Sequence, residues 1–134
     1  MIEACIRTKR DKIVSYEISG HAESGEYGHD VVCAAVSVLS ITTANNIYEM
    51  AHIKPVTQME DGYLYVEIPL SIPEKQGVLV QTLLEAFANS MKAVEKSYGQ
   101  YITLKFENGG QITCLNLICN SSPTKKVGFY FQWT

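Results

Sequence analysis

The sequence lacks the close cysteine pairs and glycine motifs that mark several common kinds of site. Its four cysteines, Cys5, Cys33, Cys114 and Cys119, include no C-x-x-C pair, which argues against a zinc ribbon or a thioredoxin-like redox centre. No P-loop, G-x-G-x-x-G or G-x-S-x-G motif is present, so the usual signatures of nucleotide binding and of serine hydrolases are missing. With no secretory context to support disulfides, we expect a cytoplasmic protein with reduced thiols.

Basic residues are too few for a protein that binds nucleic acid through its phosphates. The chain has 11 basic and 14 acidic residues, a net charge of -3, whereas phosphate binding requires an excess of positive charge. The charge is also uneven, because residues 108–134 carry Lys125 and Lys126 and no acid. Residues 1–107 therefore hold 9 basic and 14 acidic residues, a net charge of -5. We expect no direct nucleic-acid partner.

Long hydrophobic runs are missing as well. The longest apolar stretch, residues 31–41, is about half the ~20 residues that a bilayer-spanning helix needs, and two serines interrupt it. The first residues lack the charged and then apolar order of a signal peptide. We therefore expect no membrane partner. With 134 residues, 46% of them hydrophobic, the chain is long and apolar enough to fold as a globular domain.

Strand and helix patterns follow one another clearly along the chain. Apolar and polar residues alternate over 2–8 and 13–19, and the polar residues 9–12 between them predict a hairpin. Residues 20–30 contain three glycines and no apolar period, which predicts a loop. The apolar run that follows is long enough to favour a central, buried helix with Asp30 as its N-cap.

The second half of the chain repeats this pattern of a hairpin and a helix. The expected elements are an edge strand over 55–59, a turn at Asp61-Gly62, a strand over 63–68, a helix from Ser71 to Gly99 and a strand over 101–106. Ser71 and Glu74 match a capping box at the start of the helix. The order ββαββαβ predicts an α+β sandwich with a mostly antiparallel sheet and two long helices, one of them central and buried.

Residues 108–134 form a C-terminal extension of uncertain role beyond a main domain of residues 1–107. Residues 112–117 have the pattern of a further strand, residues 127–133 are rich in aromatic side chains, and the only tryptophan, Trp133, lies here. An added hairpin, a partner-binding segment and sequence not native to the domain are all compatible with this pattern. A tail that folded into the active-site cleft would inhibit the protein.

Four residues around the glycine-rich loop form the most informative constellation: His21, Asp30, Cys33 and Ser37. A thiol in the first turn of a helix feels the positive end of the helix dipole, which favours the nucleophilic thiolate. A histidine carried to it by the loop can accept the thiol proton and then protonate a leaving amine. The N–H groups around Val32 and Cys33 can hold a tetrahedral oxyanion. Asp30 orients His21 or only caps the helix, and Ser37 lies one turn beyond Cys33.

Each of these residues also has an ordinary structural interpretation. A cysteine in an apolar helix is usually a small buried residue, His21 can be a loop residue satisfied by backbone, and a serine in a helix often bonds to its own backbone. A metal site from His29 and Cys33 requires His29 inside the helix, whereas an N-cap at Asp30 places it outside. The spacing alone leaves these alternatives open.

The glycine-rich loop is flanked by two ordered motifs. Gly20-His21-Ala22 opens it, and the run Asp30-Val31-Val32-Cys33-Ala34-Ala35-Val36-Ser37 follows it. Gly62-Tyr63-Leu64 then comes ahead of the second long helix. This combination resembles the signature of the ribosomal-processing cysteine protease family, Prp, over residues 1–106.

The resemblance implies a cytoplasmic, homodimeric cysteine endopeptidase. Its substrate would be a large-subunit ribosomal protein of the L-twenty-seven family, from which it removes an apolar, aromatic-containing N-terminal extension. It implies neither a metal ion nor an organic cofactor. The implied site residues are the nucleophile Cys33, the general base His21, the supporting residues Asp30 and Ser37, and the substrate-loop residues Gly25, Tyr27 and Gly28.

A second class of function is a non-enzymatic, dimeric ribosome-assembly factor that holds a ribosomal protein without cleaving it. This alternative predicts that Cys33 is a packed core residue with an ordinary or raised pKa, whereas a peptidase needs an accessible thiol of low pKa. An RNA-binding role comes third, and the acidic balance of the chain counts against it.

Overall fold

The computed structural model describes residues 1–20 and 27–109. The elements, in chain order, are β1 (Ile2–Lys9), β2 (Lys12–Ser19), α1 (Tyr27–Ala51), β3 (Val56–Glu60), β4 (Tyr63–Glu67), α2 (Glu74–Tyr98) and β5 (Ile102–Asn108). Within the described residues this is the ββαββαβ order that the alternation predicts. The strand expected over 112–117 and the aromatic-rich segment 127–133 lie outside the described residues.

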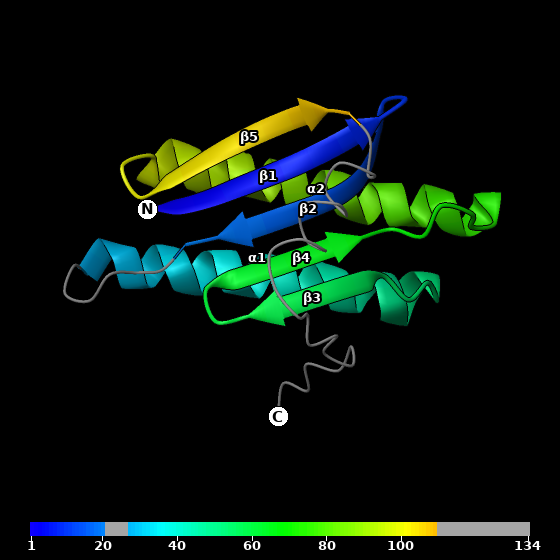
Figure 1. Ribbon diagram of the computed structural model, residues 1–134, viewed down its shortest axis with the longest axis horizontal. Helices are drawn as coiled ribbons and strands as arrows, with labels where there is room; N and C mark the ends of the chain where they lie inside the picture. The colour runs from blue at the N-terminus through cyan, green and yellow to red at the C-terminus, as the bar shows by residue number, and fades with distance from the viewer. Residues whose placement is uncertain (21–26, 110–134) are drawn as a thin grey trace.

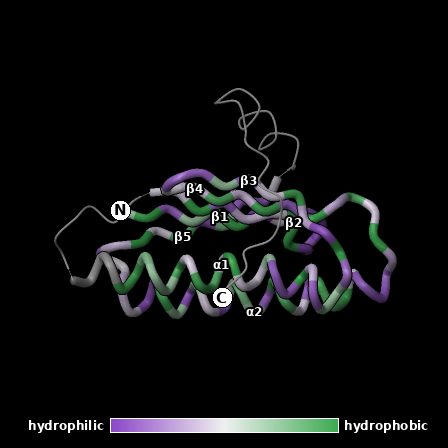
Figure 2. Tube along the Cα trace, turned by 90° about the horizontal axis from the view of Figure 1, so that it is seen from below, coloured by the Kyte–Doolittle hydropathy of each residue, from purple (hydrophilic) through white to green (hydrophobic). Residues whose placement is uncertain are grey.

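The five strands form one mixed sheet in the order β3-β4-β2-β1-β5. Neighbouring strands are antiparallel except for β1 and β5, which are parallel. Both helices lie on one face of the sheet and pack against each other (Figures 1 and 2). The predicted α+β class with a mostly antiparallel sheet is confirmed, and so is the edge position of the strand that follows Pro55.

Two tight turns set the register of the hairpins. Arg10 and Asp11 both have positive φ, 53° and 63°, the combination that lets a two-residue turn match the twist of its strands. Gly62, at φ 72°, closes the turn between β3 and β4. The register of β1 and β2 shifts after Arg7, which makes Val14 the extra residue of a bulge.

The core lies between the sheet and the two helices. Residues at most 2% exposed come from each layer: Ile2, Ala4 and Ile6 from β1, Val32, Val36 and Ile47 from α1, and Val80, Leu84 and Met91 from α2. Tyr16 joins β2 to both helices, because its ring centroid lies 4.3 Å from that of Phe87 and its hydroxyl donates to the Ser40 carbonyl at 2.6 Å. This contact holds α1 in place two turns beyond Cys33.

Helix α1 is buried along one side only. Its segment Val31–Ala51 is long and apolar enough to cross a membrane, although the shorter run read from the sequence is not. Val32, Ala44 and other residues of this segment nevertheless pack in the core beneath the sheet, as in the core helix of a globular domain. The opposite side is open, with Val38 49% exposed.

Two of the predicted helix starts are wrong. Helix α1 begins at Tyr27, so Asp30 lies inside the helix rather than at its N-cap, and residues 27–29, which were expected in a loop, are helical. Helix α2 begins at Glu74 with Pro73 as its N-cap and without a side-chain cap hydrogen bond, so Ser71 is not the cap. The fixed φ of Pro73, -58° here, presets the chain for a helical turn. Gly99 follows the last residue of α2, as predicted.

Candidate active site

Cys33 lies on α1 where the helix borders an open pocket at one end of the sheet. Its side chain is partly buried and packs against the core cluster. Because α1 begins at Tyr27, Cys33 is in the second turn, where the helix dipole acts less strongly than in the first. The N–H groups of Val32 and Cys33 lie beyond those that a helix leaves unpaired at its start. The predicted oxyanion hole at these two amides is therefore wrong.

The pocket opens to solvent, and its cavity volume is about 120 Å³. Three groups of residues form its walls: Cys33, Ser37 and Ile41 from α1, Ile2 and Ile18 from β1 and β2, and Met59, Glu60, Tyr63 and Leu64 from β3, β4 and their turn. Apolar side chains predominate, and Glu60 is the acidic residue among them. A pocket of this composition suits an apolar peptide segment with a cationic neighbour.

Gly20 carries the chain from the end of β2 to the rim of this pocket. Its φ is +107°, and a Cβ atom on it would lie 2.4 Å from the carbonyl oxygen of Met1. Its N–H donates to the carbonyl of Gly62 at 3.0 Å, which ties the end of β2 to the β3–β4 turn. Only glycine fits this backbone, and His21 is the next residue in the chain.

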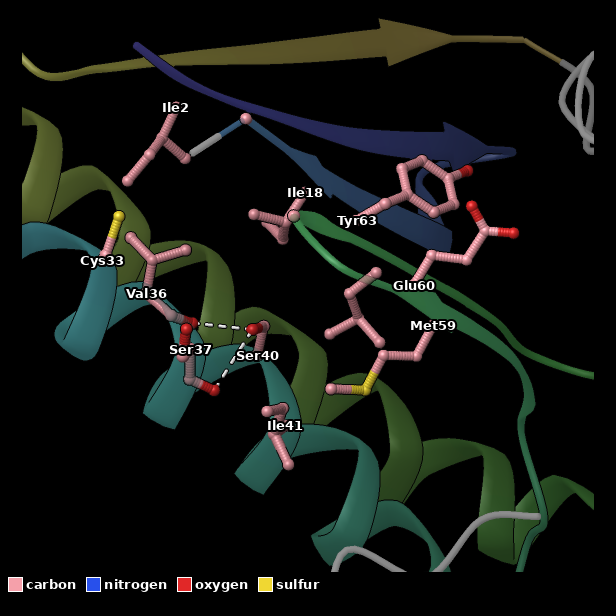
Figure 3. Close-up of a pocket in the computed structure, with 13 residues that line it drawn as sticks. Ile2, Ile18, Cys33, Val36, Ser37, Ser40, Ile41, Met59, Glu60 and Tyr63 are labelled. Atoms are coloured by element: carbon pink, nitrogen blue, oxygen red, sulfur yellow. Dashed lines mark hydrogen bonds between the residues drawn. The ribbon is translucent and has the colours of Figure 1, made fainter. Parts of the chain in front are cut away.

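Figure 3 shows Cys33, Ser37 and Ile41 on successive turns of α1, facing the space beside β3 and β4. The structure thus brings together two of the predicted site residues, Cys33 and Ser37, in one pocket. Ser37 is exposed, and its carbonyl accepts a hydrogen bond from the Ser40 hydroxyl at 3.3 Å. Ser37 is therefore open to a bound peptide.

The structure describes the other predicted site residues only in part. His21 and Gly25 lie outside the described residues. Tyr27, Gly28 and Asp30 belong to the first turns of α1, so the segment expected to be a substrate loop is helical from Tyr27 onward. The metal alternative gains no support, because the described part of the chain contains no group of three metal-ligating side chains.

Sequence reasoning missed the wall that β3 and β4 contribute. Met59 lines the pocket and Glu60 lies at its edge because Ser19 pairs with Tyr63, which sets the β3–β4 turn against the end of β2. The Asp61-Gly62 turn is predicted by the sequence, and the structure pairs Met59 with Leu64 across it. The pairing of β4 with β2 joins distant segments, however, and no local pattern indicates it.

Comparisons with known proteins agree on one family. The family model described as cysteine protease Prp matches residues 1–103. The ribosomal processing cysteine protease Prp of Bacillus subtilis is 35% identical over 101 residues, which cover 73% of this chain and 90% of that protein. The same-named protein of Staphylococcus aureus is 28% identical over 98 residues, which cover 72% and 89%.

Solved structures give the same result. A Streptococcus mutans protein superposes with a TM-score of 0.74 at 35% identity, over 81% of this chain and 96% of that chain. The Staphylococcus aureus Prp bound to a substrate peptide superposes with a TM-score of 0.70 at 25% identity, over 80% and 100%. The same protease with a covalently linked product peptide gives 0.68 at 26% identity, over 80% and 100%.

Proposed function

The chain belongs to the cysteine protease Prp family, and we propose that Cys33 is its nucleophile and His21 its general base. The observation that carries this assignment is the position of Cys33 in an open pocket whose rim includes Gly20, the residue before His21. The covalently linked product peptide in the Staphylococcus aureus relative supports nucleophilic chemistry at a residue of this kind.

The proposed reaction has two steps. The His21 imidazole accepts the Cys33 thiol proton, and the thiolate attacks the scissile carbonyl carbon, so a C–S bond forms as the C–N bond breaks. The imidazolium gives its proton to the leaving amine. Water, deprotonated by His21, then cleaves the thioester, which releases the carboxylic acid and restores the thiol. We assign Asp30 and Ser37 supporting roles beside this pair, and the step requires no metal or organic cofactor.

We propose that the substrate is a large-subunit ribosomal protein of the L-twenty-seven family, cleaved after its N-terminal extension. The apolar walls formed by Ile2, Ile41 and Met59 fit an apolar, aromatic-containing extension, and Glu60 at the rim fits the basic residues of a ribosomal protein. The net charge of -5 on residues 1–107 favours the same partner. Gly25, Tyr27 and Gly28 are assigned to the segment that contacts the peptide.

The decisive test is the intact mass of the extended ribosomal protein after incubation with the full chain. The unmodified chain should remove the extension, and Cys33→Ala should bind the protein and leave it whole. Cys5→Ala is the matched control, because Cys5 lies on the other face of the sheet, and it should cleave normally. Cleavage by Cys33→Ala at the normal rate would remove Cys33 from the mechanism. Retained binding without cleavage by any form would favour the alternative, a non-enzymatic ribosome-assembly factor.

We further propose that the protein is a cytoplasmic homodimer. The exposed side of α1 supports a partner surface, because α1 carries no charged residue from Val31 to Tyr48 although Ala34 and Val38 are exposed. Exposed surface without charge is typical of interface centres. Sedimentation should show a dimer, and Val38→Lys should shift it toward monomer. The exposed α2 substitution Thr82→Lys is the control and should leave the dimer intact.

A further inference from the structure

Helix α1 carries additional hydrogen bonds in the segment that follows Cys33. In a regular helix the partner of each carbonyl is the N–H four residues later. In this segment, side-chain hydroxyls also donate to backbone carbonyls, namely those of Val36, Ser37, Leu39 and Ser40. The proposed reaction does not use these bonds, although they begin within one turn of the nucleophile.

Three of these bonds come from the helix itself. The Ser40 hydroxyl donates to the Val36 carbonyl at 2.6 Å and to the Ser37 carbonyl at 3.3 Å, as the dashed lines in Figure 3 show. The Thr43 hydroxyl donates to the Leu39 carbonyl at 2.7 Å. Hydroxyls that bond back to the preceding turn weaken the regular pattern and often bend a helix. The direction of α1 in this segment therefore needs a contact from outside the helix to fix it.

The fourth bond comes from the sheet and provides that contact. The Tyr16 hydroxyl, on β2, donates to the Ser40 carbonyl at 2.6 Å, and the backbone of Ala44 forms a hydrogen bond with the same hydroxyl. Ser40 and Ala44 are four residues apart, so they are hydrogen-bond partners in a regular helix. A side chain inserted between two such partners is a known cause of a bend in a helix.

Tyr16 is itself held firmly. Its ring belongs to the core cluster between the sheet and the helices, and its centroid lies 4.3 Å from that of Phe87 on α2. Its backbone pairs with Ile6 of β1 on one side and with Val66 of β4 on the other. Because two strands and the second helix hold Tyr16, its hydroxyl is a fixed point for α1.

The distance from this fixed point to Cys33 makes the direction of α1 important for the site. Cys33 precedes Ser40 by seven residues, which corresponds to about 10 Å along a helix that rises 1.5 Å per residue. A change of about 5° in direction at Ser40 therefore moves Cys33 by about 1 Å. A displacement of about 1 Å at a reacting group can lower the rate about a hundredfold.

We propose that Tyr16 is a positioning residue for the protease reaction: its hydroxyl fixes the direction of α1 at Ser40 and thereby holds the Cys33 thiol in its reactive position. Tyr16 acts through the helix, because the wall of the pocket is formed by other residues, Ser40 among them. The inference rests on the proposed function, since it takes Cys33 as the nucleophile.

Tyr16→Phe removes the hydroxyl and keeps the ring beside Phe87. Ser40 and Ala44 can then bond directly to each other, which changes the direction of α1. In the mass assay, followed over time at several substrate concentrations, kcat should fall about tenfold while KM stays within about twofold, because the residues that line the peptide site are unchanged. Without substrate, iodoacetamide should label Cys33 about fivefold more slowly than in the unmodified chain, because the thiol is displaced from its base.

Gln81→Ala is the matched control, because it removes two hydrogen bonds that join α2, not α1, to β2. It should lower the urea midpoint at least as much as Tyr16→Phe does, and yet keep kcat and the labelling rate of Cys33 within about twofold. Unchanged kcat and labelling in Tyr16→Phe, or an equal loss of kcat in Gln81→Ala, would overturn the proposal. If the unmodified chain did not cleave, the proposed function would fail, and the labelling rates of Cys33 would decide the role of Tyr16 by themselves.

Discussion

At the scale of the residue, the surroundings of a side chain decide its role more than its identity does. Cys33 and Cys5 are both partly buried thiols, but Cys33 borders the open pocket, whereas Cys5 lies on the face of the sheet opposite the helices. Burial raises the pKa of Cys5 to about 11, with Arg7 opposing that rise and the nearby carboxylates of Glu107 and Glu17 adding to it. Cys5 is therefore a poor nucleophile, and of the two cysteines that the structure describes, Cys33 is the one positioned for the proposed reaction.

The rate of alkylation should distinguish Cys5 from a thiol of ordinary pKa. With its pKa near 11 instead of 9.0, Cys5 has about a hundredfold less thiolate at pH 8 than in the unfolded chain. Iodoacetamide should therefore label Cys5 about a hundredfold more slowly in the folded protein than in denaturant. Peptide mass spectrometry over time measures both rates, and equal labelling would contradict the burial of this thiol.

Gly20→Ala should damage both the fold and the site. The new Cβ meets the Met1 carbonyl oxygen at 2.4 Å with φ at +107°, so unfolding should become easier by about 2 kcal/mol or more. Cleavage should also fall at temperatures where the variant is still folded, because Gly20 directs the chain into His21. Urea unfolding and the mass assay measure the two effects.

Gly109→Ala is the matched control for that substitution. A Cβ atom on Gly109 meets nothing within 4 Å, so the change should stay within about 0.5 kcal/mol. If the two alanine variants unfolded at the same urea concentration, the close contact at Gly20 would not constrain the chain as argued above.

At the scale of the element, a few side chains fix each helix to the sheet. Tyr16 holds α1 through the Ser40 carbonyl. Gln81 of α2 binds the backbone of Ile13 twice, since its amide donates to the Ile13 carbonyl at 2.8 Å and its oxygen accepts from the Ile13 N–H at 2.9 Å. Ile13 stands beside the bulge at Val14, where regular pairing with β1 is interrupted. Gln81 supplies the hydrogen bonds that the bulge leaves open.

Gln81→Ala should destabilise the protein by about 2 kcal/mol, because two backbone groups of β2 lose their partners. Thr82→Ala removes a hydroxyl from the next, exposed position of α2 and should change stability by less than about 0.5 kcal/mol. Thermal or urea unfolding measures both variants. A Gln81→Ala protein as stable as Thr82→Ala would mean that water satisfies Ile13 equally well.

At the scale of the whole molecule, the burial of Cys5 and Tyr16 makes the free energy of unfolding depend on pH in the alkaline range. Burial raises the pKa of Cys5 to about 11 and raises the pKa of Tyr16 as well. Groups with a raised folded-state pKa contribute stability below their unfolded pKa and lose it as pH rises through the folded value. The free energy of unfolding should therefore fall from about pH 9 upward, because the unfolded Cys5 thiol begins to ionise there.

Chemical denaturation between pH 8 and pH 11 measures this loss, and Cys5→Ala should flatten its lower part. Glu67 has the same effect on the free energy of unfolding at acid pH, because burial raises the pKa of its carboxyl despite the hydrogen bond that Tyr65 donates to it. Its contribution is present below the unfolded pKa of 4.5 and is lost as pH rises toward neutrality. A flat profile from pH 8 to pH 11 would show that Cys5 and Tyr16 are accessible to water in the folded protein.

The elements of the fold could be predicted from the sequence because their signals are local. The alternation of Ile2, Ala4 and Ile6 and the Asp61-Gly62 turn depend only on neighbouring residues. The predicted helix starts are wrong for the same reason. Asp30 and Ser71 are good N-caps when only the neighbouring residues are considered. Helix α1 extends four residues further toward the N-terminus, to Tyr27, and Pro73 takes the place of Ser71 before α2.

The sequence by itself determined the α+β class, the strand and helix order, the motif around Cys33 and the family to which the chain belongs. The tertiary structure alone decided that β4 pairs with β2, which sets Met59 and Leu64 in the wall of the pocket that Cys33 borders. It also decided that Ser15 and Tyr65 are buried on the face of the sheet opposite α1 and α2. The alternation of apolar and polar residues shows which side of a strand faces the core. It does not show which distant segments pack against the strand, and burial depends on those segments.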